Sequence, residues 1–165
     1  MDDPNHPVTK DEISQAEAKM RQLPSVEASE RQLAAIIQQI ADAAKTVAPG
    51  LDWRVDANRG QDTQGCPPPY LQTDGVSMST DRLVSSAPIA DSAWSSVLNL
   101  ARDIAAPHGI TSLTVRVDKP GDHDAILHSL DNGNEIKILT RKAAVIGGST
   151  GCRYREEDLR QQPGN

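Results

Sequence analysis

Cysteines are the residues with the clearest chemistry in this chain, and there are two of them, Cys66 and Cys152. Both lie in glycine-containing stretches, and the even count favours a disulfide between them. A persistent disulfide implies an oxidising compartment outside the cytoplasm. The alternative is a pair of unrelated cytosolic thiols, while a redox-catalytic pair is disfavoured because the sequence lacks Cys-x-x-Cys spacing.

Histidine rings could serve as metal ligands, and the candidates are His6, His108, His123 and His128. Two aspartates flank His123, but the sequence contains neither His-Glu-x-x-His nor paired Cys-x-x-Cys motifs. On one predicted strand, His123 and His128 are an odd number of residues apart and therefore point to opposite faces. The sequence accordingly predicts no metal site and no cofactor.

Nucleophilic catalysis would require a serine close to a histidine and a carboxylate. Serines cluster at Ser85-Ser86 and Ser95-Ser96, but no Gly-x-Ser-x-Gly motif accompanies them. Acidic residues occur throughout the predicted exposed positions, where a solvated surface is a simpler reading than paired acid and base groups. We therefore predict no catalytic residues and a protein that is not an enzyme.

Two further segments have a composition that could bind a ligand or a partner. The run Gly147-Gly148-Ser149-Thr150-Gly151 follows a predicted strand, as phosphate loops do, but lacks the Gly-Lys-Ser/Thr ending and a following helix. We interpret it as a turn leading to Cys152. The run Pro67-Pro68-Pro69-Tyr70 predicts an extended polyproline conformation, which either stiffens the Cys66 loop or docks in an aromatic groove of a partner.

The composition limits the classes of partner. The 165 residues include two tryptophans, two tyrosines and no phenylalanine, with 17 basic against 23 acidic side chains. Single-stranded nucleic acid requires aromatic platforms and a basic groove, so no nucleic-acid partner is expected. No apolar run reaches the roughly 18 residues of a membrane span, and the polar start Met1-Asp2-Asp3-Pro4 is unlike a signal peptide.

Three helices are predicted from apolar residues that recur every three or four positions. Thr9 caps the first helix and Pro24 ends it, while Ser25 or Glu27 begins the second. Pro88 is expected in the first turn of the third helix, which ends at Pro107-His108-Gly109. The apolar stripes comprise Ile13, Ala16, Met20 and Leu23; Leu33, Ile36, Ile37, Ile40, Ala44 and Val47; and Ala93, Trp94, Val97, Leu98, Ala101, Ile104 and Ala105.

Alternating apolar residues predict strands at 51–55, at 76–86 with a bulge near Leu83-Val84, and at 113–117. Asn132-Gly133 predicts a two-residue hairpin loop between two further strands, the last of which reaches Ile146. That loop gives one apolar and one charged face, with the cross-strand pairs Leu127 with Ile138, Ala125 with Thr140, Asp124 with Arg141, and His128 with Lys137.

These elements predict an α+β fold, a two-layer α/β sandwich in which an antiparallel sheet of about five strands has helices packed on one face. Trp53 and Trp94 lie on the predicted inner faces and are expected to anchor the core. Residues 9–157 form the single domain, residues 1–8 are expected to be a flexible tether, and residues 158–165 a disordered tail.

The order of these features resembles the LppA family of mycobacterial lipoproteins over most of residues 1–157. The resemblance rests on the long helix and tryptophan strand within Ala28–Trp53, Cys66 soon afterwards, the helix end Ala105-Ala106-Pro107-His108-Gly109, and the strand from Asn132-Gly133 to Gly151-Cys152. Family members are made with a signal peptide and a lipid-modified cysteine, so the resemblance implies the soluble part of an envelope lipoprotein. The anchoring cysteine itself is absent from this sequence.

The resemblance implies an extracytoplasmic location at the cell membrane or envelope, with a lipid anchor in front of Met1. It implies no activity, because the family carries none that can be transferred. We therefore expect a non-enzymatic binding or interaction domain whose partner is another envelope protein or a ligand. Its candidate surfaces are the solvated sheet face and the loops near Cys66 and Pro67. The alternative is a small envelope hydrolase or ligand carrier, which would need a concave pocket of several hundred Å³ with converging polar groups.

Overall fold

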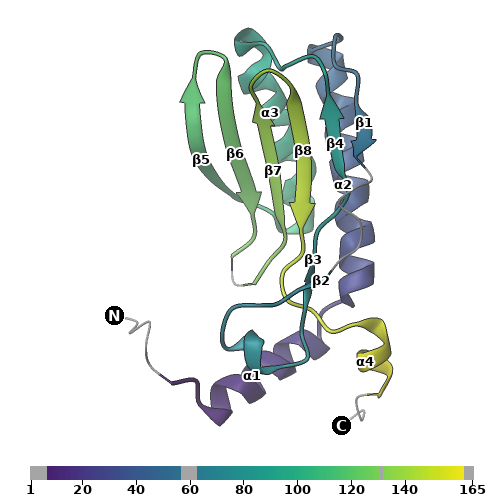
Figure 1. Ribbon diagram of the computed structural model, residues 1–165, viewed down its shortest axis with the longest axis vertical. Helices are drawn as coiled ribbons and strands as arrows, with labels where there is room; N and C mark the ends of the chain where they lie inside the picture. Colours follow the sequence, from purple (N-terminus) through teal and green to yellow (C-terminus); the bar gives the residue numbers. More distant parts are fainter. Residues whose placement is uncertain (1–6, 57–62, 131, 162–165) are drawn as a thin grey trace.

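The computed structural model describes residues 7–56, 63–130 and 132–161, so residues 1–6 of the predicted tether at 1–8 lie outside the described residues. A six-stranded antiparallel sheet forms one layer, and helices α2 and α3 form the other (Figure 1). This arrangement confirms the predicted α+β sandwich, with helices on one face of the sheet. The strand order is β1-β4-β8-β7-β6-β5, with the bounds β1 Arg54–Asp56, β4 Arg82–Ser85, β5 Ser112–Lys119, β6 Asp122–His128, β7 Glu135–Thr140 and β8 Ala144–Ser149.

Local capping explains where the first two helices begin. The Thr9 hydroxyl accepts a hydrogen bond from the Glu12 amide, and the Glu12 carboxylate accepts one from the Thr9 amide, which together form a capping box for α1 (Lys10–Arg21). Ser25 caps α2 (Val26–Val47) in the same way through the Ala28 amide. Both predicted helix starts are therefore confirmed.

The third helix, α3 (Asp91–Ala105), begins later than predicted. Pro88 lies before the helix, because the extended residue Ala90 is its N-cap and the Ile89 amide donates instead to the Thr140 hydroxyl at 2.8 Å. The helix passes into a single 3-10 turn, η3 (Ala106–His108), which Gly109 ends with a positive φ of 79°. The predicted end of this helix is correct.

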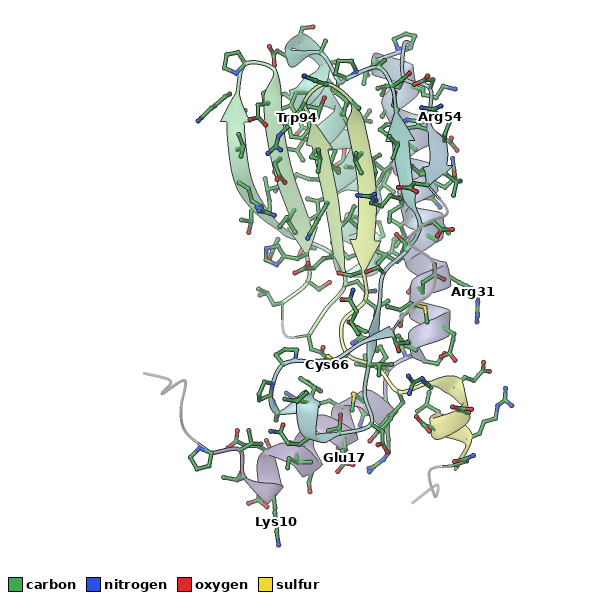
Figure 2. All side chains as sticks on the ribbon, viewed as in Figure 1. Lys10, Glu17, Arg31, Arg54, Cys66 and Trp94 are labelled. Carbon is green, nitrogen blue, oxygen red and sulfur yellow. A yellow bond between two sulfur atoms is a disulfide. The ribbon has the colours of Figure 1, made fainter. Side chains whose placement is uncertain are left out.

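An aliphatic core fills the space between α2, α3 and the inner face of the sheet. Trp94 projects from α3 into this layer (Figure 2) and is 6% exposed. Trp53 is half-buried against the same core and donates its ring N–H to the Ala41 carbonyl at 3.0 Å. Both tryptophans are therefore core residues, as predicted. Val55 and Val115, expected to be half-buried on their strands, are 60% and 51% exposed because both strands are at the edges of the sheet.

The hairpin after β6 has a different register from the predicted one. Ala125 faces Ile138, Leu127 faces Ile136, Asp124 faces Leu139 and His128 faces Glu135. The Ser129 amide donates to the Asn134 carbonyl, so four residues form the loop instead of two, and Asn132 takes the positive φ of 62°. The shift is two residues, so each side chain keeps its predicted face while the predicted pairs with Thr140, Arg141, Ile138 and Lys137 are wrong.

The predicted strand from the hairpin to Ile146 is two strands, β7 and β8. A turn closed by the Arg141 amide and the Ala143 carbonyl separates them, and Ile138 and Ile146 are cross-strand partners. The strand β8 continues through Gly147 and Gly148 to Ser149, so the predicted glycine turn is also wrong at its start. Gly148 lies under α2, where an added Cβ would be 2.9 Å from Leu33 and 3.0 Å from Ile37.

The predicted strand at 76–86 is divided as well. Residues Ser77–Met78 form β3, which pairs with β2 (Thr63–Gln64) in a separate two-stranded sheet, and the chain then enters β4 of the main sheet. The interruption lies between Met78 and Arg82, while Leu83 and Val84 are regular strand residues, so the predicted bulge is misplaced. The main sheet instead has a register shift in β5, between Val115 and Val117.

A second, smaller cluster lies below the sheet, where Cys66 is labelled near Glu17 of α1 (Figure 2). It contains Met20, Tyr154 and a disulfide between Cys66 and Cys152, whose Cα atoms are 6.1 Å apart. Pro67-Pro68-Pro69-Tyr70 is not extended: the Tyr70 amide donates to the Pro67 carbonyl at 2.9 Å, and the chain enters the 3-10 turn η2 (Tyr70–Gln72). The prolines therefore form a turn that packs Tyr70 against this cluster.

The end of the described chain is helical. Residues 158–161, predicted to belong to a disordered tail, are part of α4 (Glu156–Gln161), whose Leu159 packs against the disulfide cluster. The remainder of that predicted tail, residues 162–165, lies outside the described residues. Within the described ranges, no helix has the length and apolar character needed to cross a membrane.

Candidate functional site

The outer face of the sheet, the side opposite α2 and α3, carries the strongest candidate for a functional site. This face is turned towards the viewer in Figure 1, with both helices behind it. A cavity of about 450 Å³ opens on it across several strands. We call it the sheet-face hollow, and its lining includes Arg82, Arg116, Asp124, Lys137, Leu139 and Gly147.

The bottom of the sheet-face hollow is bare backbone at Gly147, which lies between two basic residues. Lys137 on β7 is the direct cross-strand partner of Gly147 on β8. On the other side, the Arg82 stem leans over Gly147, with its Cγ 3.1 Å from the place of a Cβ. Two basic side chains therefore rise beside a stretch of bare backbone, which leaves room for a ligand.

Asp124 is the acidic residue in the described lining. It is 7% exposed, and its Oδ1 has no hydrogen-bond partner among the described residues. Its Oδ2 lies 3.9 Å from Nε of Arg116, which is too long for a hydrogen bond. A buried carboxylate oxygen without a donor is costly, so this group is available to a ligand that brings one.

Arg82, which also lines the sheet-face hollow, contributes a second buried polar atom without a partner, after Oδ1 of Asp124. Its Nη2 donates to Asp56 at 2.8 Å, but its buried Nε has no partner among the described residues. Another hollow of about 420 Å³ lies between α3 and β6, around Arg102 and Ile110, and contains no such buried unpartnered atom. Volume alone therefore does not distinguish the two cavities, whereas their polar chemistry does.

His123 belongs to a closed polar cluster on the inner face. Its Nδ1 lies 2.8 Å from Asp118, its Nε2 lies 2.7 Å from Asp91, and its ring stacks on Trp94 with centroids 4.8 Å apart. Ionised carboxylates only accept hydrogen bonds, so both contacts are hydrogen bonds when both ring nitrogens carry protons, which is the charged form of the ring. Burial opposes this charge, but the hydrogen bonds with Asp91 and Asp118 outweigh it and raise the pKa of His123. No ring nitrogen is left to act as a base or a metal ligand.

The remaining histidines are spread over the molecule. His128 lies on the outer face and its Nε2 contacts the Thr114 hydroxyl at 3.0 Å, so His123 and His128 point to opposite faces as predicted. His108 is in η3, and His6 lies outside the described residues. Across the part of the chain that the structure describes, no three histidine, cysteine or acidic side chains are grouped as a metal would require.

Within the part of the chain that the structure describes, no hydrogen bond joins either serine pair to a histidine. Ser85 and Ser86 both donate to Asp52, at 2.8 Å and 2.6 Å, and their hydrogen bonds hold the pKa of Asp52 well below its usual range. This contact ties the entry of β1 to the end of β4. Ser95 and Ser96 are exposed on α3.

Sequence reasoning missed the sheet-face hollow. It placed Asp124 and Lys137 on a charged face but paired them with Arg141 and His128, whereas Arg141 instead donates to Asp122 at 2.9 Å. Arg82 and Arg116 were not singled out, because their strands, β4 and β5, are four positions apart in the sheet order. The sequence signal for this surface was the alternation of apolar and charged residues along each strand, which places them on opposite faces of the sheet.

The comparisons with known proteins agree with the fold. The sequence pattern of the LppA family, described as a lipoprotein confined to pathogenic Mycobacterium, matches residues 1–156. The chain belongs to the LppA family. The expected resemblance is thereby confirmed, and this family description names no specific function.

Two solved structures share the LppA-like fold. The crystal structure of the lipoprotein LppA from Mycobacterium tuberculosis superposes with a TM-score of 0.75 at 23% identity, over 92% of this chain and 90% of that one. A DUF4853 family protein from Actinomyces odontolyticus gives a TM-score of 0.59 at 14% identity, over 85% of this chain and 76% of that one. No curated protein matches the chain.

Proposed function

We propose that this chain is the globular part of a lipid-anchored envelope lipoprotein, displayed on the outer face of the membrane, which binds a ligand and catalyses no reaction. Membership of a lipoprotein family supports the membrane tether. The Cys66–Cys152 disulfide supports an oxidising compartment, because cytosolic proteins rarely keep such bonds. The tether itself would precede the described residues.

The observation that carries the binding role is the sheet-face hollow. Its volume of about 450 Å³ is in the range of small-molecule sites. Its buried Asp124 Oδ1 and Arg82 Nε have no partner among the described residues. Polar atoms in this state cost stability unless a ligand completes their hydrogen bonds, so the face is better explained by binding than by folding alone.

The residues that line the hollow favour the ligand-carrier alternative over the hydrolase alternative. Carrier function needs only a pocket with converging polar groups, and the sheet-face hollow supports that reading. Hydrolysis that depends on a histidine base or a cysteine nucleophile would need one of these residues in the pocket. The described lining contains no histidine or cysteine, and both nitrogens of His123 are bonded to carboxylates on the opposite face.

Hydrogen exchange tests the binding role before the ligand has been identified. The purified, disulfide-bonded domain is incubated with water-soluble and lipid-soluble fractions of a mycobacterial envelope extract, and exchange is measured by mass spectrometry. We expect one fraction to slow exchange in β4, β7 and β8, whose residues line the hollow. Absence of protection with every fraction would contradict the proposal.

Matched variants locate the protection. Leu139→Trp fills the hollow from its lining, while Val115→Trp places the same side chain at an exposed strand position outside the lining. Tryptophan is tolerated on strand surfaces, so both variants should fold, and their melting temperatures check this. Protection should disappear in Leu139→Trp and persist in Val115→Trp; equal protection in both would place the ligand elsewhere.

A further inference from the structure

The charge of the sheet-face hollow is opposite to that of the whole chain. The chain has a formal net charge of −6, yet the described lining of the hollow contains three basic side chains and a single carboxylate. Basic groups gathered in a concavity of an acidic protein focus a positive potential there. The expected occupant is therefore an anion.

The arrangement of the cations suits one compact anionic group. Lys137 is paired across the strands with Gly147, and the Arg82 stem contacts Gly147 from the next strand. Two strand spacings separate the backbones of the two cations, about 10 Å, with no side chain between them. Arginine and lysine side chains can reach a phosphate-sized group from both sides of this gap.

Asp124 adds a condition that a bare anion cannot meet. Asp124 belongs to the lining of the hollow and is 7% exposed, and its Oδ1 is buried without a donor among the described residues. A fully ionised inorganic anion such as sulfate has no proton to donate and would be repelled by it, whereas a hydroxyl group would donate to it. A buried acceptor of this kind selects for ligands that carry the donor and against those that lack it.

From these three features we infer that the sheet-face hollow binds a small organic phosphate that carries neighbouring hydroxyl groups, of the size of a hexose phosphate. The phosphate lies between Arg82 and Lys137 over Gly147, and a hydroxyl donates to Asp124. The volume of about 450 Å³ accommodates a molecule of this size. This inference rests on the binding role proposed above and specifies its ligand class.

Titration calorimetry at low ionic strength tests the inference with three probes: glucose 6-phosphate, glucose and inorganic sulfate, a phosphate-sized anion that carries no proton at neutral pH. Glucose 6-phosphate should bind, sulfate should bind at least about tenfold more weakly, and glucose should give no heat, because sulfate and glucose each satisfy only half of the site. No binding of glucose 6-phosphate, or equal affinity for sulfate, would overturn the inference.

Two substitutions should move the affinities in opposite directions. Lys137→Gln should weaken the binding of both anionic probes, by about tenfold, through loss of a charge-assisted contact. Asp124→Asn should tighten the binding of sulfate by removing the repulsive charge, and should narrow the difference in affinity between sulfate and glucose 6-phosphate. Asp124→Asn behaving as the unchanged protein towards both probes would contradict the role of this carboxylate.

Arg31→Gln provides the matched control, because Arg31 projects sideways from α2, to the right in Figure 2, is exposed and does not belong to the described lining of the hollow. It removes one positive charge, as Lys137→Gln does, and should leave every affinity unchanged. If glucose 6-phosphate does not bind while an envelope fraction still protects β7 and β8 from exchange, the ligand class is wrong and the binding role stands. If neither is observed, both are wrong.

Discussion

The two faces of the main sheet differ in burial: one packs against helices and the other is open. On β7, Ile136 and Ile138 are fully buried against α2 and α3, while Lys137 and Leu139 alternate with them on the open side. A single strand therefore contributes to the core and to the candidate site at successive positions. The comparison shows that substitutions one residue apart should separate stability from binding.

The two faces also differ in whether their buried polar groups have hydrogen-bond partners. On the inner face, the Thr140 hydroxyl accepts from the Ile89 amide, and both nitrogens of His123 contact carboxylates. On the outer face, Asp124 Oδ1 and Arg82 Nε are buried without a partner among the described residues. The inner face is thus complete by itself, whereas the outer face has polar groups available to a ligand.

The largest expected effect is on the inner face. Trp94→Ala should lower the free energy of unfolding by about 3–5 kcal/mol, because it removes a large buried ring and leaves a cavity in the core. Chemical denaturation monitored by circular dichroism measures the change. A loss below about 1 kcal/mol would show that the core does not depend on this ring and would break the contrast between the faces.

Two adjacent glycines sharpen the comparison. In Gly148→Ala the new Cβ would lie 2.8 Å from the Glu135 carbonyl and 2.9 Å from Leu33, so we expect a loss of about 1–3 kcal/mol from overpacking. In Gly147→Ala the nearest atom is Arg82 Cγ at 3.1 Å, on a side chain that can shift towards solvent. The second variant should unfold with nearly unchanged free energy; the reverse order would mean that the faces are misassigned.

The His123 cluster should give the inner face a pH dependence. The raised pKa of His123 means that its contribution is complete below the unfolded value of about 6.5 and is lost as the pH rises through the folded value. The Gly121 amide and His123 lower the pKa of Asp91, so its contribution is lost only on acidification. Melting temperatures measured from pH 5 to 9 should therefore fall more steeply on the alkaline side in the unchanged protein than in His123→Gln. Identical curves would contradict this assignment.

The smallest expected effect is on the outer face. Asp124→Asn should change the free energy of unfolding by no more than about 0.5 kcal/mol, or should raise it, because a buried charge without a full set of partners is removed. Denaturation of this variant beside Trp94→Ala makes the comparison direct. A loss of several kcal/mol would show that Asp124 serves folding.

Local signals made the helices predictable. Thr9, Ser25 and Gly109 mark helix ends through contacts within a few residues, and the apolar stripes agree with the buried faces of α2 and α3 except at Val47, which is 40% exposed at the end of α2. The choice of sheet face was predictable too, because it depends only on alternation. These features follow from neighbouring residues and do not depend on distant parts of the chain.

Features that depend on distant contacts were not predictable. The turn after β7 consists of Arg141, Lys142 and Ala143, which lack the usual turn residues. Gly147 and Gly148 suggested a turn because glycine is rare within strands, but α2 packs closely over Gly148. The sheet-face hollow brings β4, β8, β7, β6 and β5 together, and its composition follows only from the strand order and the true register.

An NMR titration tests the central claim, that the sheet-face hollow is where a ligand binds. The labelled domain is titrated with glucose 6-phosphate, and amide shifts are followed across both faces. The largest shifts should occur at Arg116, Lys137 and Gly147, with little change along α2 and α3. Saturable shifts centred instead on Asn99–Asp103, beside the hollow of similar volume on α3, would contradict it.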